Sequence, residues 1–243
     1  MKHLLRWEIK QSFKSKAFRG FGITFVLATF FLNLMDIFSE NDATGFDMFL
    51  RNCNNINSSF LLSFGIFAGM HVAGAFEERR IQASVMAGNS RLHIVLSKFL
   101  SFSVAIAIFA AASVGLSSIP VFLCASETGV EAFGPLMLQC ILYVFALISF
   151  LSICFVVSMC VKRLGAAIGI NLVVLFTIDI CEQLVTNEPW GETVIRYTAF
   201  GQTALCFSES SPASMMTSIW VSALGILISV VAAYIIFRKE ELK

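Results

Sequence analysis

The sequence predicts an all-α membrane protein in which six transmembrane helices form a single domain over residues 1–243. Three observations support this fold class. Of the 243 residues, 57% are apolar and only 14% are charged, whereas a soluble domain has about 25% charged residues. Apolar runs long enough to cross about 30 Å of hydrocarbon recur along the chain. Lysine and arginine gather in alternate connecting segments, as the positive-inside rule predicts for cytoplasmic loops.

Six apolar runs are the predicted spans. They are continuous, whereas the strands of a transmembrane β-barrel alternate between apolar and polar residues, so a barrel is excluded. No small-residue cleavage site closes the first run, and we expect it to remain as an anchor. The predicted spans are Gly20–Ile37, Phe60–Phe76, Phe99–Cys124, Leu136–Val161, Leu164–Cys181 and Met216–Phe237.

The basic residues predict the orientation. Of the 17 Lys and Arg residues, all but Arg51 and Arg196 precede the first span, follow the sixth, or lie between spans two and three or four and five. The other loops are acidic. Both termini are therefore predicted to be cytoplasmic. This division leaves no basic face for nucleic acid, which is excluded as a partner.

Two further segments have predicted roles in or near the bilayer. In residues 1–19 apolar side chains recur every four positions among lysines, which predicts an amphipathic helix in the headgroup layer; the alternative is a basic anchor with no mechanical role. Residues 182–215, on the outer side, are too long for a simple connection. They are expected to form either a surface loop or a pair of interfacial or re-entrant helices. Cys53 and Cys206 both face outward in this topology, and their pairing stays open.

Ionisable and small residues in the spans are candidates for function or packing. His71 is either a neutral imidazole hydrogen-bonded between helices or a proton relay. Asp179 is either an outer position exposed to water or a proton site. The pairs Gly65 and Gly69, and Gly165 and Gly169, have the spacing that lets two membrane helices approach closely.

The sequence does not predict an enzyme. It has no phosphate-binding glycine loop followed by Lys and Ser or Thr, no pair of histidines at the spacing of a helical zinc site, and no Gly-x-Ser-x-Gly elbow. We therefore predict no catalytic residue, no metal site and no cofactor in this chain.

The loop over residues 77–98 is predicted to contain a short amphipathic helix. Ile81 and Val85 share one face of it, and Gly88 would end it. Such a helix between two spans is suited to docking a soluble partner. The segment also holds Glu77, Glu78, Ser90, Arg91, Ser97 and Lys98.

These residues, together with the stretch Glu8 to Lys16, resemble the ABC-2 type permease family of bacterial ABC exporters, which includes exporters of lantibiotics and other peptides. The family's loop commonly has acidic residues, a short helix, then Gly, Ser-Arg and a terminal Ser-Lys. Arg79 and Arg80 depart from this pattern, since many members have a Gly-Thr-like turn there.

The resemblance implies a six-helix permease in the bacterial cell membrane that pairs with a second permease copy or paralogue. It also implies two separate ABC ATPase subunits, which bind the ATP and magnesium and dock on the loop helix. The expected function is therefore ATP-driven export of peptides or amphipathic antimicrobial compounds. Two alternatives stay open: a proton-coupled secondary carrier that uses His71 or Asp179, and a non-transporting membrane scaffold or sensor subunit.

Overall fold

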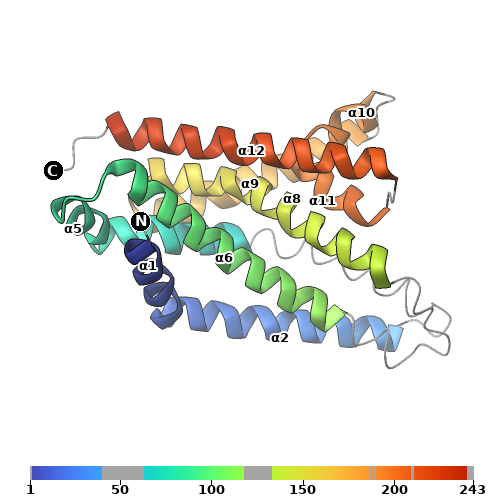
Figure 1. The fold of residues 1–243 in the computed structure, drawn as a ribbon. Helices are drawn as coiled ribbons and strands as arrows, with labels where there is room; N and C mark the ends of the chain where they lie inside the picture. The colour runs from blue at the N-terminus through green and yellow to red at the C-terminus, as the bar shows by residue number, and fades with distance from the viewer. Residues whose placement is uncertain are drawn as a thin grey trace.

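The computed structural model describes residues 2–39, 63–117, 133–186, 188, 190–208 and 211–239. All regular structure in these ranges is helical, which confirms the all-α fold class. The long helices run along one bundle, as Figure 1 shows. Cys53 and the predicted ends of spans two and three, at Phe60 and Cys124, lie outside the described residues.

Four of the described helices are long and apolar enough to cross a membrane. They are α6 (Arg91–Ser117), α8 (Phe133–Cys160), α9 (Leu164–Thr186) and α12 (Pro212–Lys239). A fifth candidate combines α1 (Lys2–Lys14) with α2 (Lys16–Ser39), which meet at a bend of 62°. The chain is thus an all-α protein with four or five candidate membrane spans in its described part.

Helices α8, α9 and α12 begin within a few residues of the predicted spans, because each is one uninterrupted apolar run. Helix α6 differs, since it begins at Arg91 rather than Phe99. The two additional turns include Lys98, which the sequence analysis placed in the cytoplasmic loop. This charge does not end the helix because its side chain is buried and paired, as described below.

The predicted second span is helical over residues 63–68 and then changes its hydrogen bonding. A π-helical turn, η1 (Gly69–Ala73), is followed by the single turn α4 (Gly74–Glu77). On the side facing α9, the Asn171 amide donates to the Gly65 carbonyl at 3.0 Å and to Ser158 Oγ at 2.9 Å. Single π turns inside helices are rare and are often found at functional sites.

An aromatic cluster forms the core between α2, residues 63–68 and α6. The rings of Phe18 and Phe109 lie 5.1 Å apart, and those of Phe25 and Phe64 lie 5.4 Å apart. Such tilted and edge-on pairs are favourable beyond the area they bury. On the outside, large apolar side chains such as Phe31 and Leu227 are exposed, as expected for surfaces that face hydrocarbon.

Helices α8 and α12 form a close interface of small residues. Ser152 Oγ donates to Ser229 Oγ at 2.6 Å, and a Cβ atom at Gly225 would overlap Ser149 Oγ. Small residues let membrane helices approach closely and hydrogen bond across the interface. Helix α8 also contacts α6, α9, η1 and α11, so it lies at the centre of the bundle.

Candidate functional site

At one end of the bundle, residues 77–98 lie beside the start of α9 and the end of α12. Glu77 Oε1 accepts a hydrogen bond from the backbone amide of Leu164 at 2.7 Å and so caps the start of α9. Arg91 Nη1 donates to the carbonyls of Phe237 and Arg238, at 3.1 and 2.6 Å, and so caps the end of α12. Figure 1 shows α1, α5 and the end of α12 at this same end.

The short helix α5 (Arg80–Met86) is held between two residues with left-handed backbone conformation. Arg79, with φ 55°, precedes it, and Gly88, with φ 81°, follows it. Glycine adopts that conformation without steric cost and is common just after a helix end. Glu78 pairs with Arg80 across the start of the helix at 2.7 Å.

The apolar face predicted to dock a partner instead packs inside this chain. Ile81 is only 1% exposed and belongs to the hydrophobic core, and Val85 is half-buried against that core. The reason is that α5 folds back on α4 and α6. Its exposed side is formed by Ala83, Met86 and Ala87, and Met86 is 82% exposed. Ile81 therefore has almost no surface to offer a partner in this structure, and Val85 offers only part of its side chain.

A buried ion pair joins α1 to α6. Lys98 Nζ lies 2.6 Å from Glu8 Oε2, and the two side chains are 1% and 2% exposed. Glu8 is the sole acidic residue of α1. A buried charge without its partner is very costly, so this contact holds α1 in a defined position on the bundle.

His71 lies beside this pair in the π turn. Ser12 Oγ donates to the Glu8 carbonyl at 2.9 Å and lies 3.4 Å from His71 Nδ1 and 3.3 Å from Ser101 Oγ. The imidazole ring stacks with Phe67 and Phe102, at centroid distances of 5.6 and 6.1 Å. We call Glu8, Ser12, His71, Lys98 and Ser101 the polar cluster.

The other ring nitrogen of His71, Nε2, has no hydrogen-bond partner among the described residues. His71 Nε2 is buried and makes no hydrogen bond to the described residues. A cavity of about 30 Å³ adjoins the ring and is also lined by Ser12, Ser15 and Arg80. This is room for about one water molecule. The described residues contain no group of three His, Cys, Asp or Glu side chains placed to hold a metal ion.

A basic groove lies outside the polar cluster, between α1 and the residues that lead into α5. It has a volume of about 790 Å³. Its lining includes four cationic side chains and one carboxylate, that of Glu78. The lining residues are Trp7, Lys10, Gln11, Lys14, Ser15, Lys16, Glu78 and Arg80.

The remaining candidate residues of the spans lie apart from the polar cluster. Asp179 accepts a hydrogen bond from Gln183 of its own helix at 3.1 Å. A Cβ atom at Gly65 would lie 2.6 Å from Leu175, and one at Gly69 would lie 2.7 Å from Ile168, so both glycines allow close packing on α9.

The second glycine pair, Gly165 and Gly169, has no such close contact among the described residues. A Cβ atom at Gly165 or Gly169 would meet no described atom within 4 Å. No described helix therefore packs closely on these two positions, and their role in helix packing stays a prediction. The α9 face on which they lie faces away from residues 63–73, which explains the open space.

At the opposite end, two short helices stand between α9 and α12. They are α10 (Gly191–Arg196) and α11 (Ala199–Ser208). A Cβ atom at Gly191 or Gly201 would collide with the carbonyls of Val185 or Ile195, so the tight turns between these helices need glycine.

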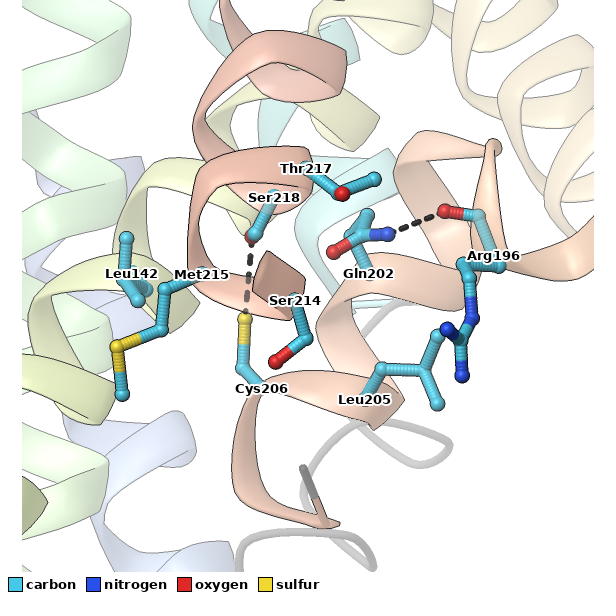
Figure 2. A pocket seen from close by; sticks show the side chains of 9 residues that line it. All are labelled: Leu142, Arg196, Gln202, Leu205, Cys206, Ser214, Met215, Thr217 and Ser218. Atoms are coloured by element: carbon cyan, nitrogen blue, oxygen red, sulfur yellow. Dashed lines mark hydrogen bonds between the residues drawn. The ribbon is translucent and has the colours of Figure 1, made fainter. Parts of the chain in front are cut away.

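The pocket beneath α11 is too small for a ligand. Figure 2 shows the Gln202 amide donating to the Arg196 carbonyl and the Cys206 thiol beside the Ser218 hydroxyl. Cys206 Sγ lies 3.5 Å from Ser218 Oγ. The pocket volume is about 10 Å³. Burial raises the pKa of the Cys206 thiol, which is free in this structure.

Sequence reasoning missed the ion pair between Glu8 and Lys98. Two signals pointed to it: a single acidic residue in an otherwise basic helix, and a lysine directly before an apolar run. Neither identifies the partner, because the two residues are far apart in the chain and only the packing of α1 on α6 brings them together.

Comparison with known proteins gives a family but no activity. No curated protein matches the chain. A family model described as protein of unknown function, DUF2705, matches residues 11–242. The match covers nearly all of the structure described above, from the last turn of α1 to the end of α12. The chain therefore belongs to the DUF2705 family.

Proposed function

We propose that this chain is the permease subunit of an ATP-driven ABC exporter in the bacterial cell membrane. Separate ABC ATPase subunits supply the energy, and the favoured cargo is a peptide or an amphipathic antimicrobial compound. The chain has six spans in this proposal: the four long helices, α2, and the segment that includes η1. Both termini are cytoplasmic, because the basic end of the bundle faces the cytoplasm.

The observation that supports this function best is the position of α5. Glu77, shortly before α5, caps the start of α9, and Arg91, the first residue of α6, caps the end of α12. A short turn over residues 87–90 joins α5 to α6. A partner that moved α5 would therefore move three long helices. The ATPase docks on the exposed side of α5, around Met86, rather than on Ile81 and Val85 as first expected.

A second permease copy or paralogue has a suitable surface on α9. Gly165 and Gly169 leave open space there, and Val173 and Ile180 are exposed farther along the helix. Small residues beside exposed apolar ones are typical of interfaces between membrane helices. This supports a dimer of permeases in which α9 contacts the partner.

The proposal is tested by substituting Met86. In a groove of the ATPase, Met86→Asp would bury an unpaired carboxylate at a cost of a few kcal/mol, which weakens docking by roughly a hundredfold or more. We expect normal expression, loss of ATPase co-purification and loss of export. The matched control Met86→Leu should retain both. Unchanged co-purification and export in Met86→Asp would refute docking at α5.

The unpartnered Nε2 atom of His71 favours one alternative, a proton-coupled carrier. In the ABC exporter His71 is structural, so His71→Gln should keep transport, because an amide can replace the hydrogen bond to Ser12. Transport that is lost in His71→Gln, and that needs no ATPase in the parent protein, would support the carrier instead. The scaffold alternative predicts no transport even with the ATPase present.

A further inference from the structure

The basic groove beside α1 has the chemistry of a lipid headgroup site. We propose that it binds one anionic phospholipid of the cytoplasmic leaflet, with the phosphate among Lys10, Lys14, Lys16 and Arg80. The inference goes beyond the proposed function, because it needs no ATPase, and it rests on that proposal only for the orientation that puts the groove at the cytoplasmic leaflet.

Charge is the first argument. Of the residues lining the groove, Glu78 alone is acidic, and its carboxylate is already paired with Arg80. Within the described ranges no carboxylate pairs with Lys10, Lys14 or Lys16. The groove therefore holds a surplus of positive charge that an anionic headgroup would neutralise.

The second argument is an apolar trough beside the groove. It has a volume of about 500 Å³ and is lined by Leu5, Arg6, Ile9 and Lys10. Lys10 lines both the trough and the groove. A lipid can place an acyl chain along Leu5 and Ile9 and its phosphate beside Lys10, whereas a free phosphate or an acidic peptide has no acyl chain to use this trough.

The third argument is the position of α1. The helix turns away from α2 by 62°, so it does not continue the line of that helix. Trp7, which is 45% exposed, lines the groove. Tryptophan is enriched at the level of lipid headgroups. The bound lipid would touch both α1 and Arg80, the first residue of α5.

The fluorescence of Trp7 reports whether a brominated lipid lies in the groove. In a Trp190→Phe, Trp220→Phe background, the purified chain is placed in nanodiscs containing increasing fractions of brominated phosphatidylglycerol or brominated phosphatidylcholine, and Trp7 quenching is recorded. We expect Trp7 to be quenched at a clearly lower fraction of brominated phosphatidylglycerol than of brominated phosphatidylcholine. Replacing Lys10, Lys14 and Lys16 together by Gln should weaken this apparent affinity roughly tenfold or more.

Two control variants separate the groove from general attraction to the bilayer. Removing the same number of charges at the same end, with Lys162→Gln, Arg163→Gln and Lys239→Gln, should leave the affinity unchanged. Replacing the three groove lysines by Arg should retain it, which also shows that the segment tolerates substitution.

Three outcomes would overturn the proposal. Equal quenching by the two lipids would show that the groove does not select an anionic headgroup. An equal loss in the two triple Gln variants would show attraction by overall charge alone. Complete displacement of the brominated lipid by excess glycerol 3-phosphate would show a site for soluble phosphate rather than for lipid.

Discussion

At the scale of single residues, the pairing of Glu8 with Lys98 makes the strongest prediction. Lys98→Met leaves the Glu8 carboxylate buried without a partner, and the expected loss of stability is about 3–5 kcal/mol. The combined variant Glu8→Gln, Lys98→Met removes both charges and should recover most of that loss. Thermal unfolding of the three proteins in the same detergent measures the effect. Equal stability of Lys98→Met and the parent protein would show that the charges are not buried together.

The two glycine pairs make a second prediction at this scale. Gly69→Ala would place a methyl group 2.7 Å from Ile168, beside the backbone of α9, and crowding of this kind costs about 1–3 kcal/mol. Gly169→Ala adds a methyl group in open space and should be neutral or slightly stabilising in the monomer, since alanine favours helix. The stability of each variant is measured by unfolding the detergent-solubilised monomer. A larger loss in Gly169→Ala would contradict the described packing.

At the scale of elements, Arg91 joins the start of α6 to the end of α12. Arg91→Gln removes its charged hydrogen bonds to the Phe237 and Arg238 carbonyls. We expect faster hydrogen exchange in the last turn of α12, with the middle of α12 unchanged. Lys239→Gln, in the same turn, is the control and should leave exchange as it is. Unchanged exchange in Arg91→Gln would show that the cap does not hold this end.

The elements also show what sequence alone can predict. The apolar runs of α8, α9 and α12 determine those helices directly, because a span needs about 20 apolar residues and little else. The sequence also identified the apolar residues of α5, but it did not show whether they pack inside the chain or face a partner. Ile81 packs into this chain and Met86 faces outward, and only the way α5 folds back on α6 decides between a core face and a docking face.

The candidate site was less predictable than the fold, for a physical reason. Lys98 at the edge of an apolar run is normally a loop residue that marks the cytoplasmic side. Its burial depends on Glu8, and Glu8 reaches it because α1 turns back across α6. The sequence identified His71 as a candidate. It could not identify Ser12 and Ser101 as neighbours in the same cluster, because these residues belong to α1 and α6 and only the packing of the helices brings them together.

At the scale of the whole molecule, the separation of charge predicts the orientation in the membrane. In a cysteine-free background, a single cysteine at Glu188 should react with an impermeant thiol reagent added to intact cells. A single cysteine at Arg163, at the basic end, should react only after the cells are opened. Both positions are exposed in the structure, so access depends on the side of the membrane. The reverse pattern would contradict the orientation.

The most direct test of the account is contact between α5 and an ATPase. A photo-reactive amino acid in place of Met86, introduced in the cells that naturally produce this chain, should form a covalent adduct with a protein that carries a phosphate-binding loop. The same amino acid at Trp190, at the other end of the bundle, should form no such adduct. If position 86 gives no ATPase adduct, or position 190 gives it equally, the chain is not an ABC permease that docks its ATPase through α5.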